Sequence, residues 1–106
     1  MAGAADDSDR RDREERLRFA ALAHPLRQDI MQPMLKGKEM PVSEVASELD
    51  SKPGAISYHV RVLLRRGALR ALARGPSVPA LYSWPPEADW VRKMLGEGGE
   101  FGGQDP

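Results

Sequence analysis

The sequence predicts a mainly α-helical domain that carries one small β-hairpin, and three observations support this prediction. Apolar side chains recur at helical spacing in five segments of the 106 residues. Proline stands at the start of several of these segments, and glycine follows the end of others, as at natural helix boundaries. Around residue 75, two short segments of alternating character flank a stretch rich in Gly, Pro and Ser, which is typical of a hairpin.

The first two predicted helices meet at Pro25. Residues 13–23 contain good helix formers and a broad apolar stripe, which predict the first helix. This helix ends before Pro25, because the residue before a proline is disfavoured in the helical conformation. Pro25 suits the first turn of the second helix, which ends at Gly37. Pro33 predicts that the last turn of this second helix is kinked or unwound, since proline removes one backbone hydrogen bond.

Two further predicted helices and a tight turn form one unit. The third helix covers residues 42–49 and follows Pro41, a residue suited to a helix start. Residues 50–52 predict the turn. The fourth helix covers residues 53–66, begins with a proline and ends before Gly67, which can adopt the left-handed conformation. Two short helices around a tight turn are typical of a helix-turn-helix unit.

The rest of the chain predicts the hairpin and one more helix. The strands cover residues 69–73 and 80–84, and the helix covers residues 87–95. Residues 1–12 are polar and charged, so we predict a disordered tail there, and the Gly-rich residues 97–106 predict a flexible tail. The folded domain is therefore predicted to cover residues 13–96.

Composition excludes several classes of function. The chain has no Cys, which excludes disulfides, thiolate metal sites and Cys nucleophiles, and its only imidazoles are those of His24 and His59. No nucleophile with a base, carboxylate pair or metal constellation stands out, so we predict no enzyme activity, no metal site and no cofactor. The sequence has no apolar run long enough to span a membrane, and its acidic start does not resemble a signal peptide, which favours a cytoplasmic protein.

The charges are segregated along the chain although they cancel overall. Residues 51–86 contain six Lys and Arg residues but no Asp or Glu. Physiological salt screens exposed charges beyond about 8 Å, so acidic residues elsewhere do not neutralise a basic surface formed by this segment. The pattern favours a nucleic acid as the partner.

The fourth predicted helix has two contrasting faces. Ile56, Val60 and Leu63 share the apolar face that packs on the other helices. The opposite face carries small, hydrogen-bonding and cationic side chains, which suit the major groove of double-stranded DNA. Only the first two turns reach the bases, so the residues that determine specificity are predicted within 52–61. The predicted DNA contacts, including phosphate contacts from the helix end and the hairpin, are Ser51, Lys52, Gly54, Ala55, Ser57, Tyr58, Arg61, Arg65, Arg66, Arg70 and Arg74.

Three short motifs resemble those of the ArsR-type winged helix-turn-helix regulators. They are Leu22-Ala-His-Pro-Leu-Arg27, Val42-Ser-Glu-Val-Ala46 and Ala55-Ile-Ser-Tyr-His-Val-Arg-Val-Leu63, followed by a glycine and the hairpin. The resemblance covers about residues 15–95. It implies a winged helix-turn-helix fold, double-stranded DNA as the partner, and a repressor of transcription. The fourth helix would be the recognition helix, and the hairpin would be the wing.

The resemblance also implies a homodimer joined through the first and last helices. The apolar stripes of these helices agree with this, since Trp and Met are enriched at interfaces. The predicted interface residues are Leu17, Phe19, Ala20, Trp90, Val91, Met94 and Leu95. Many members of the family sense metals through Cys, or through His and acidic residues of the dimer helices. This sequence has no Cys and no His in its last helix, so metal sensing is not carried over, and neither the operator nor an effector is predicted.

The residues leave several alternatives open. A winged helix can serve only to bind protein, although such a module has no reason to exclude acidic residues from 51–86. Single-stranded nucleic acid is disfavoured because few exposed aromatic residues are available for stacking. Tyr58 is assigned to a base or phosphate contact, with simple exposure as the alternative. His59 is assigned to a partly buried, hydrogen-bonded position, with a pH switch or a phosphate contact as alternatives. His24 is assigned to ordering the helix junction. Trp84 is assigned to core or hinge packing and not to a ligand platform.

Overall fold

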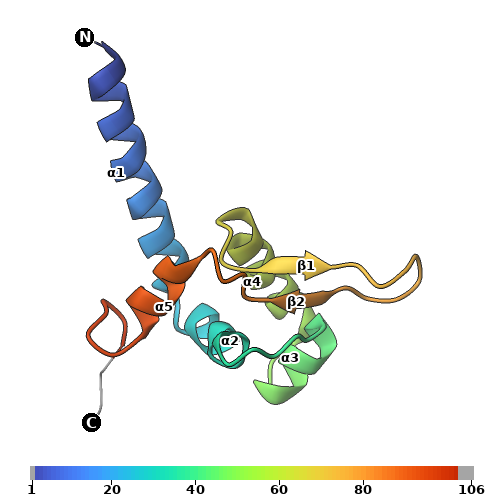
Figure 1. Cartoon of the computed structure of the whole chain (residues 1–106). Helices are drawn as coiled ribbons and strands as arrows, with labels where there is room; N and C mark the ends of the chain where they lie inside the picture. Colours follow the sequence, from blue (N-terminus) through green and yellow to red (C-terminus); the bar gives the residue numbers. More distant parts are fainter. Residues whose placement is uncertain (1, 103–106) are drawn as a thin grey trace.

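The computed structural model describes residues 2–102, with side chains from residue 7 onward. Within this range, five helices and a two-stranded antiparallel sheet follow one another along the chain (Figure 1). The elements are α1 (Ala2–Leu22), α2 (Pro25–Leu35), α3 (Val42–Glu48), α4 (Pro53–Arg65), β1 (Arg70–Leu72), β2 (Leu81–Ser83) and α5 (Asp89–Leu95). The predicted fold class, mainly α-helical with one hairpin, is confirmed.

The core is formed by one face of each of the shorter helices. Ile56, Val60 and Leu63 of α4 are each at most 1% exposed, which confirms the predicted buried face of this helix. They pack with buried residues of α2, α3 and α5, among them Met34 and Val91. Burial of each such side chain contributes about 1.5–3 kcal/mol, so this cluster fixes the orientation of α4 on the body of the domain.

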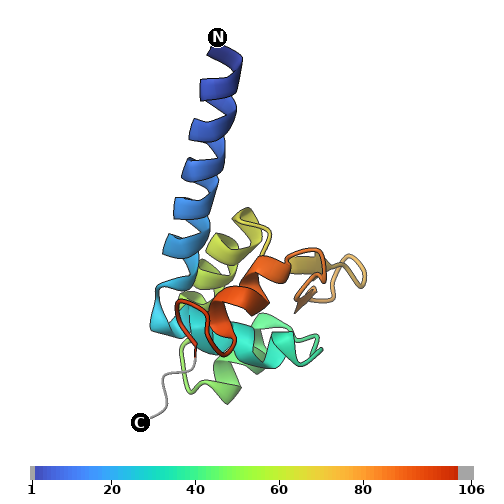
Figure 2. The same cartoon turned by 60° about the vertical axis from the view of Figure 1, so that its left-hand side comes forward.

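Helix α1 is longer than the sequence predicted. Residues 2–12, predicted to be disordered, are helical, and this part of α1 projects away from the rest of the molecule (Figures 1 and 2). Its support is local, because Asp7 pairs with Arg10 at 3.5 Å across a single turn of the helix. The segment has almost no apolar side chains, which is why the sequence predicted disorder there. Met1 lies outside the described residues.

Helix α2 continues through Pro33 to Leu35, so its last turn is not unwound. Pro33 stands in that last turn, where it leaves only the carbonyl of Asp29 without its helical partner, and Asp29 is exposed to water. Buried Met31 and Met34 hold the turn against the core. Gly37, with φ of 93°, ends the helix as predicted.

The hairpin is fastened to the helices by a backbone pairing that the sequence did not indicate. In the hairpin, Arg70 pairs with Ser83 and Leu72 with Leu81. Met40, which precedes α3, pairs with Tyr82 of β2 through N–H to carbonyl bonds of 3.0 and 2.8 Å. The connection between α2 and α3 therefore acts as a short third strand that joins the hairpin to the helical body.

The C-terminal segment is ordered where the sequence predicted a flexible tail. Residues 97–102 fold back on α5, and the Phe101 N–H donates to the Met94 carbonyl at 2.9 Å. A side chain at Gly99 would collide with the carbonyl of Lys93, so this glycine permits a close approach of two backbone segments. Composition alone suggested a flexible tail, because glycine is common both in flexible segments and where two backbone segments approach closely. Residues 103–106 of the predicted tail lie outside the described residues.

Candidate nucleic-acid interface

The turn between α3 and α4 sets the direction in which α4 leaves the body. Asp50 adopts a left-handed conformation with φ of 52°, which Asp tolerates better than most residues. The Ser51 N–H then donates to the Ala46 carbonyl at 2.9 Å, and its hydroxyl donates to the Leu49 carbonyl at 3.3 Å. Ser51 is half-buried and stabilises the turn, so it is less available to DNA than the sequence predicted.

The outer face of α4 is the exposed surface that the sequence predicted. Tyr58 is 57% exposed. The other predicted contacts that are exposed on and beside this helix are Lys52, Gly54, Ala55, Arg61 and Arg65. No acidic residue occupies the first turn, where the unpaired N–H groups and the helix dipole favour a negatively charged partner. The first turn of α4 itself therefore presents no carboxylate to a duplex.

Gly54 occupies a position at which the fold does not require a glycine. A Cβ atom built there meets no other atom within 4 Å, and Gly54 is not among the residues with positive φ. Glycine in a helix is less favourable than alanine by about 1 kcal/mol, so its use in the first turn of α4 destabilises the helix. Close approach of another molecule to the backbone is a reason for a small residue at this site.

A shallow depression of about 300 Å³ lies between α3, α4 and β2. Ser57 and Arg61 of α4 line it, together with Val42 and Tyr82. Half-buried Ser57 and exposed Arg61 therefore line the same depression, where side chains of α4 and of the hairpin meet. The predicted contacts Ser57 and Arg61 belong to one continuous surface.

Three exposed arginines of this region lack an internal acidic partner. Within residues 7–102, none of the ion pairs involves Arg61, Arg65 or Arg74. Arg74 lies in the hairpin connection and donates from Nε and Nη2 to the Pro79 carbonyl at 3.0 and 2.8 Å. The hairpin thus holds one guanidinium in a defined orientation, as a wing contact requires.

Two other predicted DNA contacts are placed differently. Arg66, at the end of α4, is half-buried and its guanidinium lies 3.8 Å from the Glu14 carboxylate of α1, so its charge is partly used within the protomer. Arg70 lies on the face of the hairpin opposite Tyr82, because it pairs with Ser83 and its Nε donates to the Ser83 hydroxyl at 3.4 Å. Side chains alternate between the faces of a strand, so Arg70 points away from the surface that Arg61 borders.

The two histidines lie together where α1, α2 and α4 meet. The Nδ1 atom of His24 accepts the Leu26 N–H at 3.1 Å, which confirms that His24 orders this junction. The ring of His59 lies 4.5 Å from that of His24. Nη1 of Arg27 lies 3.1 Å from Nδ1 of His59, and because a guanidinium can only donate, this bond requires an unprotonated Nδ1. His59 is half-buried and hydrogen-bonded, as predicted.

This environment makes stability depend on pH. Burial lowers the pKa of His59 below its ordinary value of 6.5, and the nearby His24 and Arg27 lower it further. Below pH 6.5 the unfolded chain takes up a proton at His59 that the folded chain does not. The free energy of unfolding therefore falls as pH decreases from 6.5 toward the lowered pKa, and the contribution is complete above 6.5.

We expect urea unfolding between about pH 5.5 and 7.5 to show this slope in the parent protein and a smaller slope in His59→Gln. The variant keeps a side chain that can accept from Arg27 but does not titrate. An equal slope in both proteins would assign the pH dependence to other groups.

The predicted dimer residues fall into two groups. Leu17 and Phe19 are 40% and 45% exposed, Ala20 is exposed, and Trp90 and Met94 are half-buried. Val91 and Leu95, by contrast, are 0% and 8% exposed and belong to the core of the protomer, so little of either side chain is available to a partner. A seven-residue helix cannot face both the core and a partner with all of its apolar residues.

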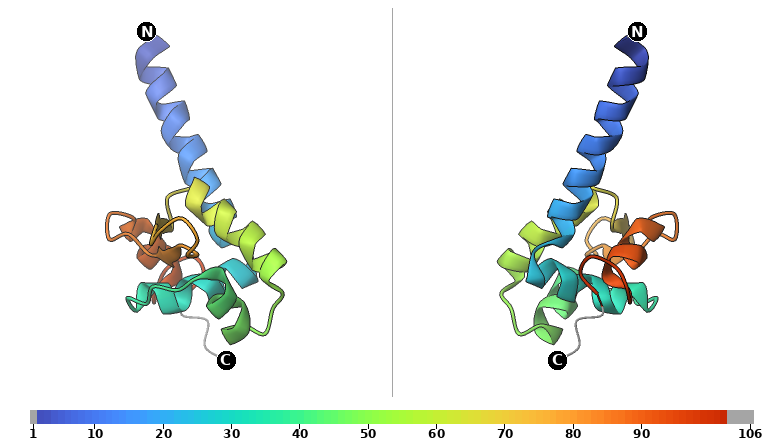
Figure 3. Two further views of the ribbon diagram at one scale, coloured as in Figure 1. Left: turned by 90° about the vertical axis from the view of Figure 1, so that its right-hand side faces the viewer. Right: turned by 90° about the vertical axis from the view of Figure 1, so that its left-hand side faces the viewer.

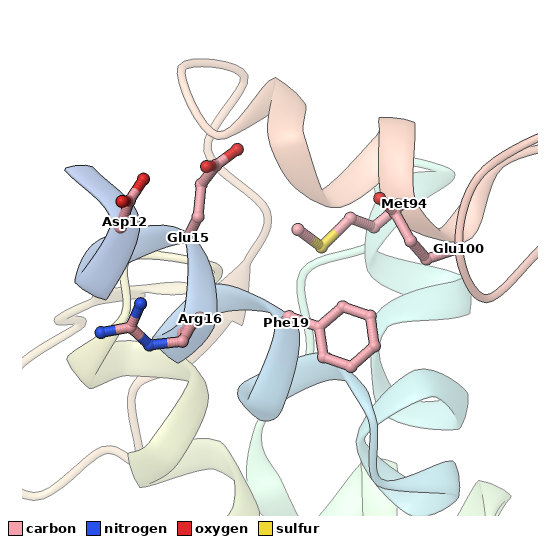
Figure 4. Close-up of a pocket in the computed structure, with 6 residues that line it drawn as sticks. All are labelled: Asp12, Glu15, Arg16, Phe19, Met94 and Glu100. Carbon is pink, nitrogen blue, oxygen red and sulfur yellow. The ribbon is translucent and has the colours of Figure 1, made fainter. Parts of the chain in front are cut away.

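Phe19 of α1 and Met94 of α5 meet at a surface pocket, whereas Leu17 and Ala20 lie on the side of α1 that faces α4. Figure 4 shows Phe19 and Met94 lining the pocket together with charged residues of α1. The Phe19 ring packs on Phe101 with a centroid distance of 4.7 Å, and the Arg18 guanidinium lies 5.0 Å from the centre of the Trp90 ring. The two helices therefore form one continuous surface with an apolar centre and a charged rim.

A second basic cluster, which the sequence did not indicate, lies at the base of the hairpin. Lys36, Lys38 and Arg92 line a pocket there with Arg70 and Trp84. These residues come from the end of α2, the hairpin and α5, and no local spacing connects them. The pairing of Met40 with Tyr82 and the packing of α2 and α5 in one core bring these segments together.

Two kinds of feature are absent from the described part of the chain. No group of three or more His, Asp or Glu side chains is arranged to hold a metal ion in that part. None of its helices combines the length and the apolar character needed to cross a membrane.

Comparisons with known proteins agree with this architecture. Residues 22–76 match the family model described as a helix-turn-helix domain. Among solved structures, the chain is similar to NolR from Sinorhizobium fredii, with a TM-score of 0.71, 24% identity and coverage of 85% of each chain. It is similar to reduced HlyU from Vibrio cholerae, with a TM-score of 0.68, 23% identity and coverage of 83% of this chain and 87% of the other. No curated protein sequence matches the chain.

A third similar structure is the homodimeric winged helix-turn-helix DNA-binding domain Mb0332 from Mycobacterium bovis, a possible ArsR-family transcriptional regulator. The TM-score is 0.72 at 24% identity, over 87% of this chain and 82% of the other. The winged helix-turn-helix fold expected from the ArsR-type motifs is thereby confirmed.

Proposed function

The chain belongs to the helix-turn-helix domain family, and from this premise we propose that it is a transcriptional regulator that binds specific sequences of double-stranded DNA. The observation that carries the proposal is the outer face of α4, which is exposed, free of acidic residues and backed by a buried apolar face. An α-helix of this kind fits the major groove. The protein acts in the cytoplasm as a repressor, without a cofactor or catalytic activity.

The residues divide by the part of the duplex that they contact. Those of the first two turns of α4 read base edges: Lys52, Gly54, Ala55, Ser57, Tyr58 and Arg61. Arg65, at the end of the helix, and Arg74, in the wing, bind phosphates. Ser51 and Arg66 have weaker roles because both are partly engaged within the protomer. Arg70 is removed from the DNA contacts because it points to the other face of the hairpin.

A homodimer formed through α1 and α5 completes the proposal. The apolar residues of its interface are Phe19, Trp90 and Met94 at the junction of α1 and α5, with Leu17 and Ala20 on the side of α1 that faces α4. This arrangement is supported by the exposure of Leu17 and Phe19 and by the homodimeric state of the similar Mb0332 domain. Two recognition helices about 34 Å apart would read successive major grooves of an imperfect palindrome.

The first test is a fluorescence-anisotropy titration of a labelled duplex from the region upstream of the protein's own gene, repeated over a series of salt concentrations. We expect saturable binding whose affinity falls by about 0.9 log units per log unit of salt for each phosphate contacted. An unrelated duplex of the same length should bind about a thousandfold more weakly. Absence of binding at low salt would overturn the proposal and favour a winged helix that binds only protein.

A further inference from the structure

The basic cluster at the base of the hairpin lies on the side of the molecule away from α4. In Figure 3, α4 lies on one side, and α5, the hairpin and the connection between α2 and α3 lie on the other. The cluster lines a pocket of about 330 Å³, which we call the Trp84 pocket. Its charged and aromatic lining consists of Lys36, Lys38, Glu39, Arg70, Trp84 and Arg92.

The pocket has an excess of positive charge. Four Lys and Arg side chains and one Glu line it. Lys38 lies 3.8 Å from the Glu48 carboxylate, but within residues 7–102 none of the ion pairs involves Lys36, Arg70 or Arg92. Cations brought together around one cavity repel each other, and an anion bound among them would relieve this repulsion. Guanidinium groups suit carboxylate and phosphate because they donate two parallel hydrogen bonds.

The pocket also has an apolar wall that is held in place. The Trp84 Nε1–H donates to the Ala88 carbonyl at 2.9 Å, which fixes the indole ring. The Arg92 guanidinium lies 4.5 Å from the centre of this ring, and the Ser83 hydroxyl, on a residue only 5% exposed, accepts from Arg70 at 3.4 Å. Met34, Leu35 and Pro86 extend the apolar surface. Both guanidinium groups are therefore held before a ligand arrives.

We propose that the Trp84 pocket binds a small organic anion that combines a carboxylate or phosphate group with a planar apolar body. Arg70 and Arg92 hold the anionic group, and Trp84 with its apolar neighbours contacts the body. The inference goes beyond DNA binding and does not depend on it. Because the pocket joins the hairpin to α5, its occupation would connect the wing with the dimer helices; that consequence alone rests on the proposed function.

The test is an NMR titration of the ¹⁵N-labelled full chain, without DNA, using phenyl phosphate as the probe. We expect saturable binding with a Kd of about 1–10 mM, as for a ligand of this size, and shifts of the Lys36, Gly37 and Arg70 amides and the Trp84 indole N–H. Inorganic phosphate, which lacks the apolar body, and benzyl alcohol, which lacks the charge, should each bind more weakly. Shifts centred on α4 or the absence of saturation would overturn the proposal.

Two variants and a matched control assign the effect to the pocket. Arg70→Gln and Arg92→Gln should each weaken phenyl phosphate binding about tenfold, because each removes a charge-assisted hydrogen bond. Arg11→Gln removes the same charge from the exposed, projecting part of α1 and should leave the affinity unchanged. Equal affinity in all three variants would overturn the site. So would a loss of duplex affinity in Arg70→Gln with phenyl phosphate binding intact, since this would make Arg70 a DNA contact.

Discussion

Replacement of Arg61 by Ala is expected to weaken binding of the specific duplex about 5- to 150-fold, equivalent to about 1–3 kcal/mol. Arg61 is exposed on the outer face of α4 beside Ser57, and no ion pair within residues 7–102 involves it. Its guanidinium is therefore free to form two hydrogen bonds to a guanine or to a phosphate. Anisotropy titrations of parent and variant at one salt concentration measure the loss.

The matched control for Arg61→Ala is Arg11→Ala. Arg11 is exposed on the projecting part of α1, and its removal changes the net charge by the same amount. We expect the control to change the affinity less than about twofold, since long-range effects are screened. Equal losses in the two variants would remove Arg61 from the interface. If Arg61 contacts a phosphate, both specific and unrelated duplexes lose affinity and the salt slope falls by about one; if it reads a base, the specific duplex loses more.

The division of α4 into two faces could be predicted because it depends on sequence periodicity alone. Ile56, Val60 and Leu63 recur at helical spacing, and any stable packing of this helix must bury them. The start of α4 at Pro53 and the glycine after its end, Gly67, follow from backbone restrictions that act within a few residues. The candidate DNA surface is the remaining face of the same helix, so most of it followed from the same periodicity.

The features that the sequence did not predict depend on contacts between distant segments. Alternation along β1 indicates that Arg70 and Ala71 face opposite ways, but not which of the two faces the helices. The packing of the hairpin on the helical body decides this, and the pairing of Met40 with Tyr82, which no motif indicates, is part of that attachment. The Trp84 pocket joins the end of α2, the hairpin and α5, which are distant in the sequence. The burial of Val91 likewise depends on how α5 lies against the core, which its apolar stripe alone does not determine.

The position of α1 connects the two parts of the proposed function. Near its end it contacts α4 through Glu14 and Arg66, and its exposed Phe19 lies beside α5. A dimer formed on this surface would therefore fix the separation of the two α4 helices through direct contacts. Duplex affinity should depend on dimerisation, because a monomer can contact only one half-site of a palindrome.

Replacement of Phe19 by Asp is expected to raise the dimer dissociation constant at least about a hundredfold, since it places a carboxylate in the apolar centre of the interface. Sedimentation velocity at micromolar concentration should show a dimer for the parent protein and a monomer for the variant. The specific duplex should then bind the variant much more weakly, with a salt slope reduced toward half.

Val78→Asp provides a closely matched control for Phe19→Asp. Phe19 and Val78 are each 45% exposed within the protomer, so each change introduces one carboxylate at an apolar position of equal exposure. Val78 lies in the hairpin connection, far from α1 and α5 (Figure 1). The control should therefore remain a dimer, although its new charge near the wing should weaken duplex binding. A Phe19→Asp protein that remains dimeric would contradict an interface formed by α1 and α5, whereas dissociation of both variants would show that the added charge, and not its position, determines assembly.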